Sequence, residues 1–178
     1  NDEIPNLESE DFKRNTNDIV IFNQLFFYFK FNLLYDKMLW PGTKGCKKGK
    51  LKSLSWLRNI KLKKYPFWRL DTLFSDNKYI DLNVINDGGW HFTNLKTPEE
   101  MYEKFMNFGH HDEFRLSGIT VEKIREKITN KEMFYDHFAD KSSSNKWESN
   151  YKLKLLNEKI LPKFLIENKN KYIEWFSN

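Results

Sequence analysis

Two parts of the chain hold side chains that could bind a metal ion or move a proton. Asp2 and Glu3 are adjacent carboxylates in front of a proline, and hard divalent cations prefer carboxylate oxygens. His91 follows two glycines and a tryptophan, and its imidazole could ligate a metal or relay a proton. The alternatives are acids that are merely solvated beside a turn, and a histidine that is satisfied within the core.

A third cluster, His110-His111-Asp112-Glu113, places four ionisable groups next to one another. Two histidines beside two acids could bind a metal. However, adjacent residues of a helix point about 100° apart, so they seldom share one ion. A structural network at a helix end is therefore the alternative to a metal site in this cluster.

The positive charge of the chain is concentrated in one segment. The net charge is +5, and residues 44–64 contain nine Lys and Arg and no acid, so the remainder of the chain is net negative. Such a segment attracts the phosphates of a nucleotide, a nucleic acid or a lipid surface. One alternative is a solvated loop, and another is a module that binds single-stranded nucleic acid with Trp56 as a stacking platform.

Length and composition favour one domain with a buried core. The chain has 178 residues, of which 39% are hydrophobic, 31% charged and 17% aromatic. Cys46 is the single cysteine, which excludes an internal disulfide. The most apolar run, residues 20–29, is interrupted by polar side chains and falls well short of the ~18 residues that a membrane-spanning helix needs. We therefore expect no membrane span in this chain.

Strand patterns dominate the first half of the chain. Alternating apolar residues predict strands over residues 19–35 and 79–85. Between them, Trp40–Thr43 is typical of a turn, and Ser53–Arg58 could form a short helix.

Helix patterns dominate the second half. Thr97, Pro98 and Glu100 form a capping box with a proline at the first helical position, and a second helix is expected to begin at Thr120. Strands followed by helices predict an α/β fold, with a mixed sheet followed by C-terminal helices in one domain.

Seven short motifs follow one another along about residues 1–130. They are D-E-I-P, W-x-G-T-K-x-C-K, S-x-x-W-L-R-N, Y-P-x-W-R-x-D, G-G-W-H-F, T-P-E-E and H-x-E-F. In this order and spacing they resemble glycosyltransferase family 17, whose best-known member adds the bisecting β-1,4-linked N-acetylglucosamine to N-glycans. The resemblance implies a single partial GT-A-like glycosyltransferase domain over residues 1–178, with 131–178 as a helical C-terminal extension.

The first of these motifs is incomplete in this chain. In the family it reads D-x-D-E-I-P and belongs to the metal site, whereas here Asn1 matches the spacer and Asp2 the second aspartate. We therefore expect the chain to begin inside the domain, truncated before Asn1 and without the N-terminal nucleotide-binding strands of a GT-A fold. On its own, such a fragment is expected to be inactive.

The resemblance also implies roles for individual residues. Asp2 and His91 would hold a divalent ion, Mn²⁺ or Mg²⁺, that neutralises the departing nucleoside diphosphate. An inverting transfer needs a carboxylate base, for which the candidates are Asp87, Asp112 and Glu113. The residues expected to bind the donor, by charge or by stacking on a sugar, are Lys44, Arg58, Arg69, Trp56 and Trp90.

The implied reaction is transfer of N-acetylglucosamine from UDP-GlcNAc to a mannose-containing or other glycan in β-1,4 linkage. Such a transferase has a UDP-sugar and a glycan as partners, and no nucleic acid. Its compartment would be cytoplasmic in a microbe or virus, and the Golgi membrane in a eukaryote. Besides the nucleic-acid module described above, a non-catalytic remnant of a transferase is an alternative.

Overall fold

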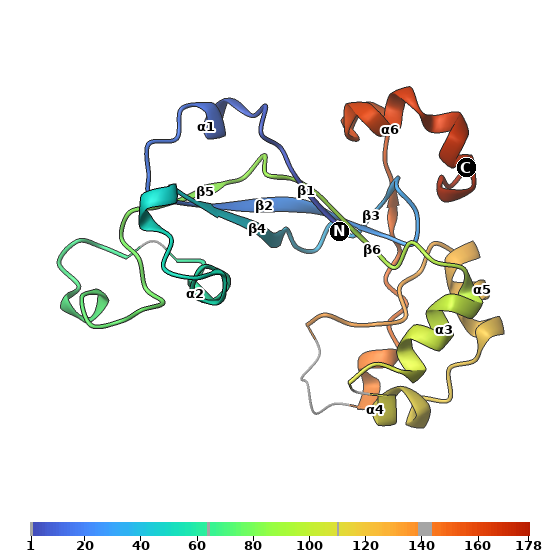
Figure 1. The fold of residues 1–178 in the computed structure, drawn as a ribbon. Coiled ribbons are helices and arrows are strands. Elements are labelled where there is room, and N and C mark those ends of the chain that lie inside the picture. The colour runs from blue at the N-terminus through green and yellow to red at the C-terminus, as the bar shows by residue number, and fades with distance from the viewer. Residues whose placement is uncertain (1, 64, 110, 139–143) are drawn as a thin grey trace. The chain divides into compact units, whose positions relative to one another are not determined.

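Figure 1 shows the computed structural model, which describes residues 2–63, 65–109, 111–138 and 144–178. These residues form a mixed α/β structure, in agreement with the prediction from the sequence. The strands are β1 (Glu3–Pro5), β2 (Ile19–Tyr28), β3 (Leu33–Leu34), β4 (Trp40–Cys46), β5 (Leu82–Ile85), β6 (Gly89–Thr93) and β7 (Lys154–Leu155). The α-helices are α1 (Glu10–Lys13), α2 (Leu54–Asn59), α3 (Pro98–Met106), α4 (His111–Leu116), α5 (Val121–Thr129) and α6 (Lys163–Glu167). Short 3₁₀ helices cover Lys48–Lys50, Leu70–Thr72, Ser144–Trp147, Glu158–Ile160 and Lys169–Trp175.

Within the described residues, seven strands form one mixed sheet that is centred on β2. β2 pairs antiparallel with β3 and β4, and parallel with β5. β1 pairs antiparallel with β6, and β3 pairs antiparallel with β7. The strand order is β1-β6-β2-β3-β7, with β4 and β5 also joined to β2.

The chain divides into two compact units, neither of which is continuous in sequence. Unit 1 consists of Asn1–Leu25 and Met38–His91. Unit 2 consists of Phe26–Lys37 and Phe92–Asn178. Of the three crossings between the two units, one falls inside β2, one falls inside β6, and the third, between Lys37 and Met38, lies between β3 and β4.

In unit 1, β2 is buried on both faces. One face contributes to a hydrophobic cluster of Ile19, Ile21, Trp56, Ile60 and Leu82. The other face contributes to a second cluster of Val20, Phe22, Ile85 and the partly buried Phe12. This double burial explains why the start of β2 is apolar at every position instead of alternating between apolar and polar residues.

Aromatic rings form much of the core of unit 2. Contacting pairs among Phe105, Phe114, Phe134 and Trp147 have ring centroids 5.1–6.2 Å apart. Most of these pairs are tilted or edge-to-face, which is the arrangement that the quadrupoles of the rings favour. The high aromatic content of the sequence is therefore used to join α3, α4 and the segment after α5.

The predicted helix starts are confirmed. Thr97 Oγ1 accepts from the backbone N–H of Glu100 at 3.2 Å, and the Glu100 carboxylate accepts from that of Thr97 at 3.0 Å, which completes the capping box. Ser53 caps α2 and Thr120 caps α5 through their side-chain oxygens.

The turn predicted at Trp40–Thr43 is wrong, because these residues begin β4. Pro41 lies opposite Asn23, where the register between β2 and β4 shifts. A proline is tolerated in a sheet at such an irregular position, because no regular ladder hydrogen bond is lost there.

The C-terminal extension is only partly helical. It contains α6 and 3₁₀ helices, but β7 pairs with β3 and an isolated bridge joins Glu132 to Lys152. The pairing of β3 with β7 joins residues more than 100 positions apart, so no local sequence pattern could have predicted it.

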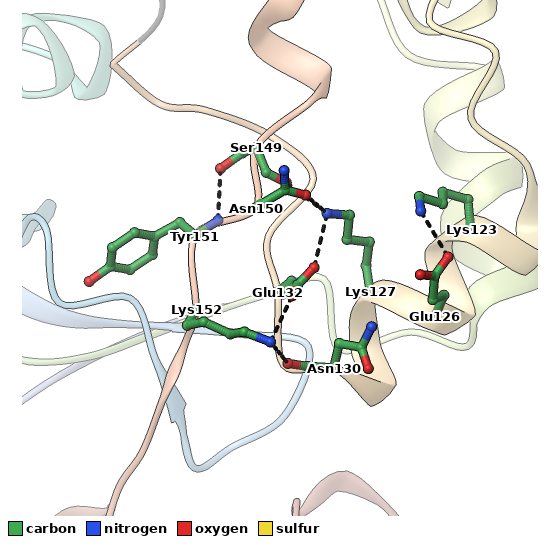
Figure 2. A network of polar contacts seen from close by, with 9 residues as sticks. All are labelled: Lys123, Glu126, Lys127, Asn130, Glu132, Ser149, Asn150, Tyr151 and Lys152. Atoms are coloured by element: carbon green, nitrogen blue, oxygen red, sulfur yellow. Dashed lines mark hydrogen bonds and ion pairs between the residues drawn. The ribbon is translucent and has the colours of Figure 1, made fainter.

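A polar network around a buried lysine fixes the segment after α5 (Figure 2). The Lys127 ammonium donates to Glu132 at 3.1 Å, to the carbonyl of Ser149 at 3.1 Å, and to the side chain of Asn150. Lys152 adds a second ion pair with Glu132 at 2.7 Å. The hydrogen bonds from Lys152 and then Lys127 lower the pKa of Glu132. A buried ammonium is tolerated here because it is fully paired.

Candidate functional site

The pairing of β1 with β6 depends on a close approach of two backbones at Gly89. Gly89 lies opposite Pro5 and has a φ of +108°. A Cβ at this position would lie 2.2 Å from the carbonyl oxygen of Ile4. The register that results places Glu3 opposite His91. Directly opposed residues share one face of a sheet, so these two side chains are neighbours.

Trp40 of β4 joins the other two side chains into one cluster. Its indole stacks on the buried imidazole of His91, with ring centroids 4.5 Å apart and planes inclined by 10°. Its Nε1 donates a hydrogen bond to Glu3 Oε1 at 2.8 Å. One side chain therefore covers the histidine and orients the carboxylate.

The other oxygen of Glu3 is held by Thr43, which also belongs to β4. Thr43 Oγ1 donates to Glu3 Oε2 at 3.2 Å and accepts from Nε2 of the fully buried Gln24 at 3.5 Å. Gln24 packs against Gly42, where a Cβ would lie 2.0 Å from its Oε1. Gln24 and Thr43 are therefore positioning residues for the Glu3 carboxylate.

Glu3, Trp40 and Thr43 line a cleft of about 430 Å³ in unit 1. Its walls come from β1, β4 and α2, and its charged and hydroxyl side chains are Glu3, Thr43, Lys44 and Arg58. The cleft thus combines a carboxylate, two cationic residues and the indole of Trp40. That combination suits a ligand with an anionic group and a ring.

Lys44 has a structural role at this cleft. Its ammonium donates to the carbonyl oxygens of Arg58 at 2.6 Å and Ile60 at 2.7 Å, at the C-terminal end of α2. Burial lowers the pKa of Lys44, and repulsion from Lys61 lowers it further. Arg58 is exposed and forms no ion pair within the described part of the chain, so it is the cation better placed for a ligand.

The predicted metal ligands Asp2 and His91 are not brought together by this register. Side chains alternate along an extended chain, so Asp2 falls on the side opposite to Glu3, and it is exposed. Glu3 is instead the carboxylate beside His91. Among the described residues, no group of three or more His, Cys, Asp or Glu could hold a metal ion.

Neither of the tryptophans predicted to stack on a sugar lines this cleft. Trp56 is buried in the core, and its Nε1 donates to the carbonyl of Asp76 at 2.8 Å. Trp90 precedes His91 in β6 and therefore points to the opposite face of the strand. Trp40 lines the cleft instead, and it is part of the W-x-G-T-K motif that the sequence already showed.

The burial of Trp56 also bears on the nucleic-acid alternative, which needs it as a stacking platform. Several lysines of the basic segment have partners within unit 1. Lys47 and Lys50 pair with Asp18 at 3.1 Å and 3.0 Å, and Lys52 pairs with Asp76 at 3.2 Å. The structure therefore favours ion pairs within the protein, rather than contacts with a nucleic acid, as the role of these lysines.

Arg69, predicted to bind the donor, belongs to a loop of unit 1 and does not line the cleft. It donates to both carboxylate oxygens of Asp71, at 2.8 Å and 2.7 Å, and Lys78 donates to the same group at 2.5 Å. These bonds, with Arg69 the larger cause, lower the pKa of Asp71 to about 2.

Acidification is expected to break the contacts of Arg69 and Lys78 with Asp71. Because the folded pKa of Asp71 is depressed from 3.8 to about 2, its stabilising effect is complete above pH 4 and is lost as the pH falls through 2. An NMR titration of the Asp71 carboxyl should show this, and Asp71→Asn should raise the backbone mobility around Arg69 and Lys78 at neutral pH. The exposed Asp76, which makes one ion pair, is the matched control; an equal effect of Asp76→Asn would contradict the role of Asp71.

One candidate base, Asp87, lies in unit 1 and the other two in unit 2. Asp87 accepts a hydrogen bond from the side chain of Asn6 at 3.1 Å in the turn between β5 and β6. It does not line the cleft, and no described contact sets it apart as a base.

Asp112 and Glu113 belong to α4 in unit 2. Asp112 is exposed, and its carboxylate lies 3.3 Å from Nε2 of His111. Glu113 forms an ion pair with the buried Lys146. These contacts agree with the structural network that the sequence allowed for this cluster, in which His110 lies outside the described residues.

Comparison of the chain with protein-family models, with curated proteins and with solved structures finds no match. Among the described residues, no helix is both long enough and apolar enough to cross a membrane.

Proposed function

We propose that this chain is part of a metal-dependent inverting glycosyltransferase with a GT-A-like fold. The reaction is transfer of N-acetylglucosamine from UDP-GlcNAc to a glycan in β-1,4 linkage. The observation that carries the proposal is the convergence of Glu3, Trp40 and Arg58 on one cleft. Each comes from a different motif of the resemblance, and His91 of a fourth motif stacks on Trp40.

The residues at the cleft fit a divalent ion that protein and substrate hold jointly. Each oxygen of Glu3 accepts one hydrogen bond from the protein, which leaves lone pairs for an ion. His91 lies behind Trp40 and does not line the cleft, so Glu3 is the cleft residue that would hold the ion. Mg²⁺ is commonly bound by one or two carboxylates, with substrate phosphates supplying further ligands. Such an ion would stabilise the negative charge that develops on the departing diphosphate.

The other cleft residues bind and orient the donor in this proposal. Arg58 offers a planar guanidinium that suits bidentate contact with a phosphate. Trp40 is half-buried in the wall of the cleft, so its indole is placed to stack on a ring of the donor. Lys44 holds the end of α2 and thereby the position of Arg58.

Donor binding is the direct test. Calorimetric titration of UDP-GlcNAc against the full open reading frame that contains this chain should show binding with Mn²⁺ and none without it. Glu3→Gln and Arg58→Ala are each expected to weaken binding by ~10-fold or more, because each removes one charged contact to the ion or the phosphates.

Arg14→Ala is the matched control for these variants, because Arg14 is exposed and its ion pair in the described part of the chain is with Glu10, away from the cleft. It should bind the donor like the parent protein. A folded protein that binds no UDP-sugar in the presence of Mn²⁺ would overturn the proposal. If binding is found, loss of transfer with retained binding identifies the base among Asp87, Asp112 and Glu113.

A further inference from the structure

A loop of unit 1 exposes an unusual number of large apolar side chains. Figure 1 shows this segment, residues 65–78, as an irregular loop between α2 and β5. Within eight consecutive residues, five such side chains are exposed: Phe67 by 82%, Trp68 by 68%, Leu70 by 71%, Leu73 by 74% and Phe74 by 90%. Single exposed apolar residues are ordinary, but a contiguous group of this size usually marks an interaction surface.

The polar groups of the same loop make contacts within the protein. Asp71 is bound by Arg69 and Lys78, as described above. The ring of Tyr65 lies close to three cations: Arg69 at 5.5 Å, Lys63 at 5.8 Å and Lys78 at 6.0 Å from its centroid. This arrangement is the reverse of a water-exposed loop, in which the polar side chains face solvent and the apolar ones pack inside.

The loop is also held to the rest of unit 1. The carbonyl oxygen of Asp76 accepts from the buried indole of Trp56, and that of Asn77 accepts from the backbone N–H of Lys61 at 2.9 Å. Thr72 Oγ1 donates to the carbonyl of Arg69 at 2.6 Å and closes the 3₁₀ turn. The exposure of the apolar side chains is therefore built into an ordered loop.

Two cations without an ion pair in the described part of the chain, Lys61 and Lys63, adjoin this apolar surface. Residues 44–78 contain eleven Lys and Arg and two acids. Lys61 and Lys63, which lead into the loop, form no ion pair within the described part of the chain. The surface thus combines Trp, Phe and Leu with cations that still need an anionic counterpart.

We propose that residues 67–74 dock onto the surface of an anionic phospholipid bilayer. Phe, Trp and Leu enter the interfacial region, where aromatic and aliphatic side chains are favoured, and Lys61 and Lys63 contact the lipid phosphates. An anionic bilayer offers phosphates to Lys61 and Lys63, whereas an apolar protein face would leave these two cations without partners. The inference does not depend on the proposed function, because no residue of the loop lines the cleft.

Flotation with vesicles tests the proposal. The protein should float with phosphatidylcholine vesicles that contain about 30 mol% phosphatidylserine, and bind pure phosphatidylcholine ~10-fold or more weakly. A triple variant, Phe67→Ser with Trp68→Ser and Phe74→Ser, should lower binding by ~10-fold or more without changing the melting temperature, because these side chains are already exposed. Lys61→Gln with Lys63→Gln should remove most of the dependence on phosphatidylserine.

Two controls make the test specific. Leu116→Ser changes a side chain that is 88% exposed in unit 2, and it should leave binding unchanged. Brominated lipids should quench Trp fluorescence in the parent protein, and less so in Trp68→Phe, which retains an apolar ring. The proposal is overturned if the folded protein does not float, or if the triple Ser variant floats equally well. Self-association without lipid that the triple variant abolishes would assign the surface to a second copy of the chain instead.

Discussion

Gly89→Ala is expected to destabilise the protein strongly and to separate Glu3 from His91. The new Cβ would lie 2.2 Å from the carbonyl oxygen of Ile4 and 2.6 Å from the backbone nitrogen of Asn6, so β1 would have to move. The backbone φ of +108° is in addition one that only glycine adopts without strain. Together, strain and overpacking are expected to cost about 2–5 kcal/mol, which is a large share of the ~5–15 kcal/mol that stabilises a typical domain.

Thermal unfolding followed by circular dichroism measures this effect, with an expected fall in Tm of roughly 10 °C. Gly49→Ala is the matched control, since a Cβ there meets no atom within 4 Å and its φ is not positive. It should melt within about a degree of the parent protein. If Gly89→Ala melts at the same temperature as the parent protein, β1 does not approach β6 as closely as the structure describes.

Lys127→Ala is expected to lower the free energy of unfolding by about 3 kcal/mol or more. The substitution removes the donor that satisfies the carbonyl of Ser149 and the side chain of Asn150, and it leaves Glu132 with Lys152 alone. Buried polar groups that lose their partner cost about 1–3 kcal/mol each, and the lost lysine stem adds a packing term.

Urea denaturation of two further variants separates these causes. Lys127→Met keeps an apolar stem without donors, and it should lose about half as much stability as Lys127→Ala. Lys123→Ala, in the same helix, removes an exposed lysine with a single ion pair to Glu126 at 2.8 Å, and it should cost less than about 0.5 kcal/mol. Parent-like stability of Lys127→Met would show that the network in Figure 2 contributes no net stability.

Local sequence patterns predicted the structural features that depend on residues close together in the sequence, such as helix starts and strands. Thr97 with Glu100 specifies a helix start through two reciprocal hydrogen bonds within four residues, and the structure contains both. The apolar run from Ile19 predicted a strand because its β-branched and aromatic residues suit a buried position in a sheet. Trp40–Thr43 misled the prediction because Pro and Gly are typical of turns, whereas here they meet an irregularity in the pairing of β2 with β4.

The candidate site depends on register, which the sequence does not reveal. Residues 3, 40 and 91 become neighbours only because β1 pairs with β6 and Trp40 reaches across from β4. A shift of one residue in the β1–β6 register would place Asp2 beside His91, as the resemblance implied. Gln24 was also missed, although a polar side chain within the apolar run of β2 was a usable signal for a positioning role.

The discontinuous units have a consequence for protein synthesis. Unit 1 needs Met38–His91, so its sheet cannot be completed on the ribosome until β5 and β6 have emerged. By then Phe26–Lys37, which belong to unit 2, are already outside and must wait for Phe92 and the residues after it. Long-range pairing of this kind slows folding and exposes unpaired strand edges. The nascent chain therefore passes through a stage with two incomplete cores, at which a chaperone that shields apolar strands would raise the yield of folded protein.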